Sequence, residues 1–184
     1  MYELDVRLFH AINGGPDWAS PLFVFLSEAT KAWSVRLVLV ALAILLIVLG
    51  GKARQGVLRA LVAWPVADGI THWLKLAVAW PRPCVELNDV VLRVGKLTSF
   101  GTASAHAANT AAVATVFVIA LGFKKAWPVA ALAFLTGFSR IYVGVHYPLQ
   151  VLLGWTIGVA VGLVVTWAWG QAARLLRREP QPSG

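Results

Sequence analysis

The chain has 184 residues, of which 59% are hydrophobic and only 13% are charged. A soluble domain carries about 25% charged residues, so this composition excludes an ordinary soluble enzyme and indicates an integral membrane protein. The formal net charge of +8 would suggest a nucleic-acid partner in a soluble chain, but here the charges flank long apolar runs and no nucleic-acid partner is expected. The single cysteine, Cys84, excludes an intrachain disulfide.

The first 32 residues predict a segment at the membrane surface. Four apolar residues of the stretch 4–12 share one helical face: Leu4, Leu8, Phe9 and Ile12. Asp5 and Arg7 lie away from that face, as is typical of an amphipathic interfacial helix. Residues 13–17, Asn-Gly-Gly-Pro-Asp, end this helix. Residues 21–32 are only partly apolar because Glu28 and Lys31 interrupt them, so this stretch is expected to be interfacial or re-entrant.

Five apolar segments follow, each long enough to cross about 30 Å of hydrocarbon at about 1.5 Å per residue. They cover residues 33–50, 57–80, 103–123, 126–145 and 148–171. The sequence therefore predicts an all-α membrane bundle of about five transmembrane helices plus the N-terminal interfacial helix. Residues 1–178 form one membrane-embedded domain, with residues 1–32 as its interfacial or re-entrant part, and residues 179–184 form a disordered tail.

Basic residues beside the apolar segments predict the orientation. Those that fall on one side are Lys52, Arg54, Arg59, Lys124, Lys125, Arg174, Arg177 and Arg178. The positive-inside rule makes this side cytoplasmic. The N-terminus is then outside, the C-terminus inside, and the loop of residues 81–102 extracytoplasmic.

Three polar clusters are expected to meet at the outer side. They comprise Lys75 with Arg82-Pro83, then Ser104 with His106, then Ser139-Arg140 with His146. An arginine at membrane depth needs an anion or a polar cavity, and a neutral histidine can act as a nucleophile or carry a proton. Pro148 is suited to open a helix, which would place His146 at an N-terminal end that favours anions. The convergence predicts a phosphate-binding cavity with its own acid and nucleophile.

A polar stripe runs along the second apolar segment. Asp68, Thr71, His72 and Lys75 fall at i, i+3, i+4 and i+7, so they share a helical face that is expected to point into the bundle. Asp68 and His72 either support the residues that line the cavity, or Asp68 forms an internal ion pair with Lys75 or His72 that only stabilises the bundle. Lys75 is the member nearest the cavity.

In this order on five or six spans, Lys-x6-Arg-Pro, Ser-x-His and Ser-Arg-x5-His resemble the membrane-bound type 2 phosphatidic acid phosphatase superfamily. The opening Tyr-Glu-Leu and Phe-His-Ala-Ile-Asn-Gly, followed by a polar re-entrant stretch, is similar to the bacitracin-resistance type of undecaprenyl-diphosphatase. The resemblance covers residues 75–150 in motif and the whole chain in layout.

The resemblance implies a phosphatase that needs no metal or other cofactor and works through a phosphohistidine. His146 would attack phosphorus, and His106 would protonate the leaving oxygen and then activate water. The phosphoryl oxygens would be held by Lys75, Arg82, Ser104 and Arg140. Asp68, His72 and Ser139 would support these groups.

Two positions depart from the family pattern. The second motif usually contains glycine where this chain has Ala105, and the third usually ends in Asp where it has Gln150. Gln150 can accept a hydrogen bond from the His146 ring but brings no charge. This leaves open a slow enzyme, an engineered inactive form and a natural non-catalytic relative.

The expected function is hydrolysis of undecaprenyl diphosphate to undecaprenyl phosphate at the outer face of a bacterial inner membrane. Phosphatidylglycerophosphate, phosphatidic acid and a lipid A phosphate are alternative substrates, and a lipid-phosphate binding or transport protein is the competing class. Gly154, Gly158 and Gly162 recur every four residues, which allows close helix packing within the chain or in a dimer. A monomer or weak homodimer is therefore expected.

Overall fold

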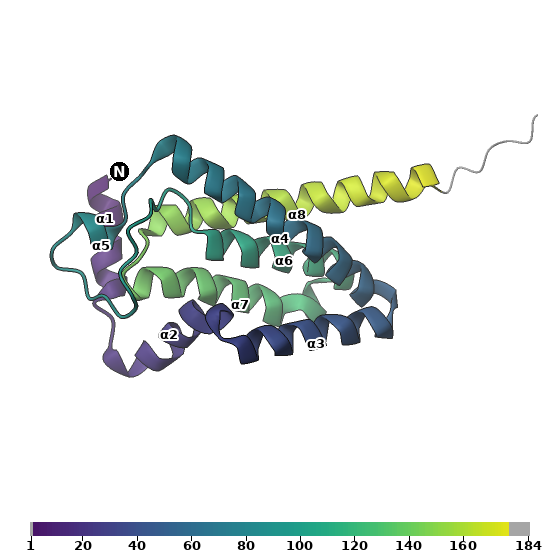
Figure 1. Ribbon diagram of the computed structural model, residues 1–184, viewed down its shortest axis with the longest axis horizontal. Coiled ribbons are helices and arrows are strands. Elements are labelled where there is room, and N and C mark those ends of the chain that lie inside the picture. The colour runs from purple at the N-terminus through teal and green to yellow at the C-terminus, as the bar shows by residue number, and fades with distance from the viewer. Residues whose placement is uncertain (1, 177–184) are drawn as a thin grey trace, which may run out of the picture.

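The computed structural model describes residues 2–176, and the tail expected over residues 179–184 lies outside them. The described chain is all-helical (Figure 1). Its long helices are α1 (Tyr2–Asn13), α2 (Ser20–Glu28), α3 (Trp33–Leu49), α4 (Gly51–Val78), α6 (Ala105–Leu121), α7 (Phe123–Tyr142) and α8 (Pro148–Leu176). Three short elements complete it: η1 (Asp17–Ala19), η2 (Ala29–Lys31) and α5 (Pro83–Glu86).

Glycine and proline mark several of the helix ends. Gly50 and Gly122 join consecutive helices with φ values of 77° and 83°, a left-handed region that L side chains rarely adopt. Pro148 opens α8, as expected from the sequence. The expected start of the second segment at residue 57 is six residues late, because α4 continues through the basic turn of Lys52 and Arg54. Hydropathy marks the hydrocarbon region, whereas the helix continues into the interface.

Small residues form the centre of the bundle, where α6 packs against α4 and α8. Ala63 and Ala67 of α4 are fully buried against Ala108 and Ala112 of α6. Close packing of small side chains lets helix backbones approach each other in an apolar solvent, where burial of large side chains gives little advantage. The core therefore brings the first turns of α6 and α8 side by side.

The glycine stripe of α8 faces α6. A Cβ at Gly154 would lie 2.5 Å from the Ser104 carbonyl oxygen, and one at Gly158 would collide with the Ala108 carbonyl oxygen. At Gly162 it would lie 2.6 Å from Cβ of Thr115. The stripe is thus an intramolecular contact, the first of the two uses expected from its spacing.

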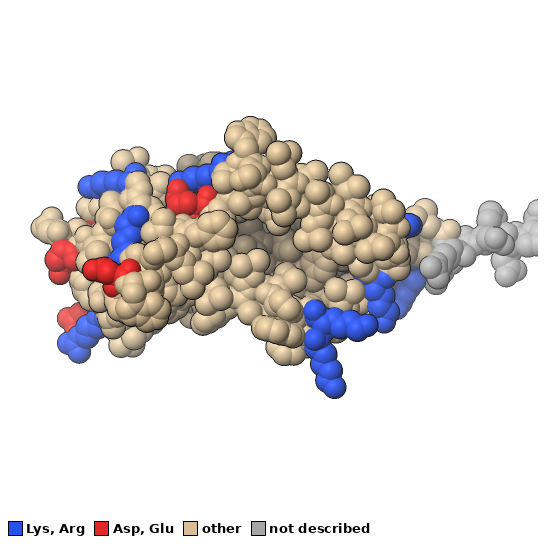
Figure 2. Space-filling model, turned by 90° about the horizontal axis from the view of Figure 1, so that it is seen from below, with Lys and Arg blue, Asp and Glu red and all other residues tan. Residues whose placement is uncertain are grey.

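Large apolar side chains lie on the outside. None of the 17 residues of α3 is buried, and Leu37, Val48 and Trp33 are among its most exposed side chains. In Figure 2 a broad belt of uncharged side chains separates two charged ends, and the Asp and Glu side chains of that face all lie at one end. A small-residue core within an apolar exterior is the arrangement of a chain in a bilayer.

Within residues 2–176, length and apolarity identify α8 as a helix able to cross a membrane alone. Residues 17–31 and α3 are long and apolar enough to cross a membrane only when taken together, and they meet at a bend of 71°. The other expected spans fall short for physical reasons: α6 is apolar but has 17 residues, while α4 and α7 carry charged residues. The all-helical class is confirmed, whereas the count of five spans stays a prediction.

Helix α1 lies across the end of the bundle beside α5 (Figure 1). Its buried face consists of Asp5, Phe9 and Asn13. The prediction that Phe9 shares a face with Leu4 and Leu8 is wrong, because Phe9 is buried whereas Leu4 and Leu8 are exposed. Val6 and Ile12 pack beside Phe9 against the core, whereas Glu3 and Arg7 are exposed together with Leu4 and Leu8.

Candidate active site

His146 lies in the short connection between α7 and α8. The backbone N–H groups of Val145 and His146 both donate to the Arg140 carbonyl, at 3.1 Å each. Gly144 has φ of +90°, and a Cβ there would lie 2.8 Å from Val90 and 3.0 Å from the Val91 carbonyl oxygen. The turn therefore needs glycine, and it leaves the His146 side chain 2% exposed.

Gln150 fixes the tautomer of His146. Its amide nitrogen donates to the Pro81 carbonyl at 2.7 Å, and its Oε1 accepts from the backbone N–H of Tyr147 at 3.3 Å. These two bonds leave Oε1 as the atom that faces Nδ1 of His146, 3.0 Å away. Because an amide oxygen only accepts, Nδ1 carries the proton and Nε2 carries the lone pair.

Arg82 meets that lone pair. Its Nη1 lies 2.7 Å from Nε2 of His146 and 3.0 Å from the Val145 carbonyl oxygen. A guanidinium has no acceptor, so Nε2 must be unprotonated, in agreement with the contact to Gln150. Further bonds from Arg82 to the Ser99 and Phe100 carbonyls, at 2.6 Å and 3.2 Å, join the site to the loop before α6.

The environment of His146 keeps its ring neutral. Burial lowers the pKa of His146 well below the ordinary value of 6.5, and the positive charges of Arg82, Arg140 and Lys75 lower it further. A neutral ring with a lone pair on Nε2 is the form of histidine that can act as a nucleophile.

Gly101 closes the loop over these side chains. A Cβ at Gly101 would lie 2.7 Å from Oε1 of Gln150 and 2.8 Å from Cγ of Arg82. Its backbone N–H donates to the Trp80 carbonyl at 2.7 Å, which ties the two ends of the loop together. The absence of a side chain at this position is what allows Gln150 and Arg82 to flank the same ring.

The second cluster starts α6. Ser104 caps this helix, accepting the N–H of Ala107 at 3.4 Å, while its own backbone N–H donates to the Gln150 carbonyl at 2.9 Å. That backbone bond holds the first turns of α6 and α8 together. His106 follows in the first turn of α6 and is half-buried, and its ring has no hydrogen-bond partner within residues 2–176.

Arg140 reaches the N-terminal segment. Its Nη1 donates to the carbonyl and hydroxyl oxygens of Ser27 and lies 3.7 Å from a carboxylate oxygen of Glu28. Its Nε is buried and has no partner in the described chain. Lys75 is half-buried, and its ammonium group likewise has no protein partner within that range. Both cations keep donors available for an anion.

Three expected supporting residues lie apart from this cluster. The expectation that the whole polar stripe points into the bundle is wrong, because Asp68 and His72 are exposed. Among the four members of the stripe, Thr71 alone is buried. Asp68 accepts a hydrogen bond from Asn109 at 2.9 Å, and no ion pair joins it to Lys75 or His72 in the described chain. Ser139 is buried but donates to the Thr136 carbonyl of its own helix.

Several residues of the site were not recognised in the sequence. Ser27 and Glu28 contact Arg140, Ser99 binds Arg82, and Gly101 leaves the space that Arg82 and Gln150 fill. They act through backbone groups or lie far from the motifs in sequence, so no local spacing marks them. Glu28 offered a signal, as a carboxylate in an apolar stretch requires a partner.

A neutral histidine beside cations with free donors lies at one end of an apolar helical bundle, an arrangement typical of a membrane protein with a polar site. Residues 56–174 match the PAP2 superfamily, and the chain therefore belongs to this superfamily of membrane phosphatases. It is 29% identical over 161 residues to undecaprenyl-diphosphatase BcrC of Bacillus subtilis, a match that covers 88% of this chain and 82% of BcrC.

Two solved structures are similar to the fold. LpxE of Aquifex aeolicus superposes with a TM-score of 0.77 at 27% identity, covering 89% of this chain and 95% of LpxE. A transmembrane PAP2-type phosphatidylglycerolphosphate phosphatase of Bacillus subtilis superposes with a TM-score of 0.68 at 23% identity. This match covers 97% of this chain and 89% of the other. The family and the all-α class expected from the three motifs are thus confirmed.

Proposed function

We propose that this chain hydrolyses a polyprenyl diphosphate, with undecaprenyl diphosphate as the first candidate. The proposal rests on the contacts of His146 with Gln150 on one side and Arg82 on the other. Together they leave Nε2 of His146 unprotonated and beside a cation. The similarity to a protein named undecaprenyl-diphosphatase over most of both chains supports this substrate. The relatives' names leave phosphatidylglycerophosphate and other lipid phosphates as alternatives.

In the proposed reaction, Nε2 of His146 attacks the terminal phosphorus. A nitrogen–phosphorus bond forms while the bond to the leaving oxygen breaks, and His106 gives that oxygen its proton. His106 then takes a proton from water, which attacks phosphorus and releases phosphate from the ring. Arg82 must leave the Nε2 lone pair for this attack and, with Lys75 and Arg140, can then bind the phosphoryl oxygens. Ser104 is proposed to assist through the start of α6.

The experiment is a panel of lipid phosphates in detergent, with chelator present and phosphate release as the readout. We expect release from undecaprenyl diphosphate by the parent chain and none by His146→Ala. Inorganic phosphate should raise the melting temperature of both, because it binds only the folded state. Arg140→Ala should reduce that rise, since a charge-assisted contact contributes about 1.5–3 kcal/mol. Release that survives His146→Ala would exclude this mechanism.

A lipid-phosphate binding or transport protein is the second candidate, favoured by one observation. Gln150 stands where a carboxylate would stabilise the imidazolium that forms during attack, and it brings no charge. A chain that is stabilised by phosphate but releases none from any lipid would support this candidate.

We also propose five spans, a monomer or weak homodimer, and a bacterial inner membrane location with the site outside. The similarity in fold to a structure described as a transmembrane phosphatase supports a bundle that spans the membrane. The distribution of charge supports the orientation, because Lys52, Arg54, Lys124, Lys125 and Arg174 sit at helix ends opposite to the site.

Labelling of single cysteines tests the orientation. In a Cys84→Ala background, a cysteine at Asp89 should react with an impermeant thiol reagent on intact cells, and one at Lys125 should be protected. Both positions are exposed in the structure, so access depends on the side of the membrane alone. Reaction at 125 with protection at 89 would place the site in the cytoplasm.

A further inference from the structure

The buried face of α1 lies against the connection that carries His146. Asp5, Phe9 and Asn13 recur every four residues, and each is no more than 2% exposed. None of them belongs to the three motifs, and α1 lies outside residues 56–174, the part of the chain that matches the family. A helix of 12 residues that buries an acid and an amide needs an explanation beyond apolar packing.

Asp5 contacts the chain just after His146. Its Oδ1 accepts the backbone N–H of Leu149 at 2.9 Å, across 144 residues of sequence. This N–H belongs to the first turn of α8, where no partner within the helix exists for it. The second carboxylate oxygen of Asp5 is buried and has no partner among residues 2–176, so the bond to Leu149 is the evident reason for an acid here.

Phe9 contacts the residue next to His146. Its ring lies edge-on to that of Tyr147, with 5.6 Å between the ring centroids. The hydroxyl of Tyr147 donates to Glu86 of α5 at 2.8 Å. Tyr147 is therefore held from two sides, and its backbone N–H in turn faces Oε1 of Gln150.

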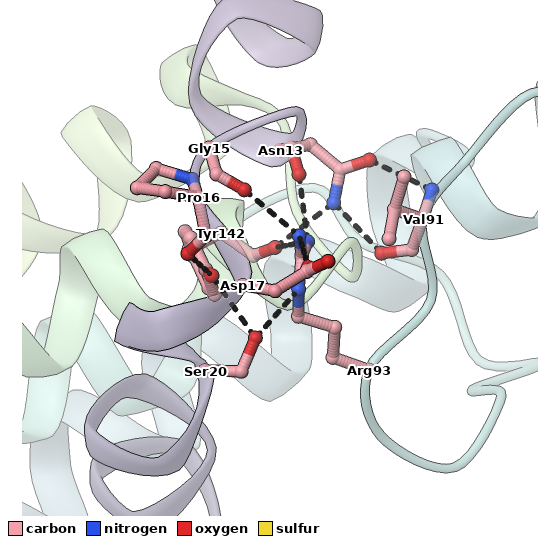
Figure 3. Close-up of polar contacts among 8 residues, drawn as sticks. All are labelled: Asn13, Gly15, Pro16, Asp17, Ser20, Val91, Arg93 and Tyr142. Carbon is pink, nitrogen blue, oxygen red and sulfur yellow. Dashed lines mark hydrogen bonds and ion pairs between the residues drawn. The ribbon is translucent and has the colours of Figure 1, made fainter.

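Asn13 contacts the chain just before His146. Its amide nitrogen donates to the carbonyls of Tyr142 and Val91 at 2.9 Å each, and its Oδ1 accepts the N–H of Val91 at 2.9 Å. Figure 3 shows Arg93 in the same network. Its Nη1 donates to the carbonyls of Asn13 and Tyr142 at 2.6 Å and 3.0 Å.

We propose that α1 positions the nucleophile. Its residues Asp5, Phe9 and Asn13 hold residues 142–149 in place and so fix the position of the His146 ring. This inference rests on the proposed function of His146. The contacts bracket His146 on both sides, at Tyr142 before it and at Tyr147 and Leu149 after it. Without them the connection keeps its attachment to α7 and α8 and the contacts that Arg82, Arg93 and Glu86 make to it, which leaves the direction of attack less defined.

The consequence for rate follows from geometry. A displacement of about 1 Å in a reacting group can lower the rate about 10²-fold, while binding by the surrounding cations is little changed. We therefore expect Asp5→Ala to lower kcat by about 10²-fold, with KM changed by about threefold at most. Asn13→Ala should act in the same direction.

The test compares Asp5→Ala with Asp5→Asn and Glu3→Ala. Asn keeps an oxygen that can accept the Leu149 N–H, so Asp5→Asn should stay within about threefold of the parent. Glu3→Ala removes an exposed carboxylate from the same helix and should have no effect. Hydrogen exchange of residues 143–149, measured by mass spectrometry, should accelerate in Asp5→Ala only. Full-length chains in detergent are used throughout.

The two readouts separate this inference from the proposed function. Unchanged kcat and unchanged hydrogen exchange in Asp5→Ala would contradict the positioning role of α1. Phosphate release by the parent chain would still support the proposed enzyme activity. An equal loss in Asp5→Asn or in Glu3→Ala would also contradict the positioning role, because the effect would not follow the hydrogen bond. If no lipid releases phosphate even with the parent chain, the enzyme proposal fails. The exchange rates then decide whether α1 holds the His146 connection.

Discussion

Gln150→Asp is expected to raise the rate of phosphate release by about 10²–10³-fold. The His146 ring becomes cationic when Nε2 bonds to phosphorus, and a carboxylate at Nδ1 offsets that charge while an amide does not. In a serine protease triad, replacing the aspartate by asparagine costs about 10⁴-fold through the wrong tautomer. Here the Pro81 carbonyl already orients the Gln150 amide so that it favours the right tautomer of His146. The loss of rate caused by Gln150 should therefore be smaller than in the protease.

The pH dependence of the rate gives an independent check on this change. A carboxylate beside the ring favours the imidazolium and raises the pKa of His146. Because attack requires the neutral ring, the acid limb of the rate profile should move to higher pH in Gln150→Asp. The variant also loses the bond to the Pro81 carbonyl, so its stability should fall by about 1 kcal/mol.

Three outcomes have distinct meanings. A faster variant with unchanged affinity for inorganic phosphate identifies Gln150 as the partner of the ring. No gain in a chain whose parent is active would show that Gln150 does not tune His146. His146→Ala in the Gln150→Asp background should release no phosphate, and release by that double variant would place the nucleophile elsewhere.

Arg82→Ala is expected to lower kcat/KM by about 10³-fold or more. Removal of one donor that stabilises a developing charge costs about 10²–10³-fold, and Arg82 also fixes the loop through the carbonyls of Ser99 and Phe100. Both functions need the planar fork of a guanidinium, which binds several acceptors at once. Arg82→Lys should therefore recover little of the loss.

A variant of Ser99 separates the two roles of Arg82. Ser99→Ala removes only the hydroxyl contact at 3.3 Å and keeps the carbonyl that Arg82 binds at 2.6 Å. It should stay within about threefold of the parent in kcat/KM. A loss in Ser99→Ala as large as that in Arg82→Ala would mean that loop order, not charge, limits the reaction. Near-normal kcat/KM in Arg82→Lys would contradict the need for a fork.

The sequence predicts the helices well where glycine or proline stops them. Gly50, Gly122 and Pro148 mark junctions that the structure places within a few residues of expectation. Prediction is weaker at the start of α4, because a helix can extend past the hydrocarbon on basic side chains. It is weakest for the surroundings of α1, because hydropathy reports the affinity of a face for lipid and not its protein partner.

The motifs locate the ring and its cations but not what holds them. His146, Arg82 and Gln150 meet in the structure, as the spacing of the motifs and the topology led us to expect. Asp68 and His72 do not join them, because a helix with α6 on one side has room for polar groups at the edge of that contact. Ser27, Gly101 and Asn13 act through contacts between distant segments, and helical periodicity carries no information about such pairs.

The bond between Asp5 and Leu149 sets an order of assembly. The ribosome delivers α1 before α8, and the amide that Asp5 binds emerges 144 residues after Asp5 itself. Loop closure over such a distance costs entropy that only the completed α4–α6–α8 core can offset. Until then the face of α1 that carries Asp5 and Asn13 must remain in contact with water or with the lipid headgroups. Helix α1 is thus made before its partner and can make this bond only after the start of α8 has formed, so the His146 connection is complete only then.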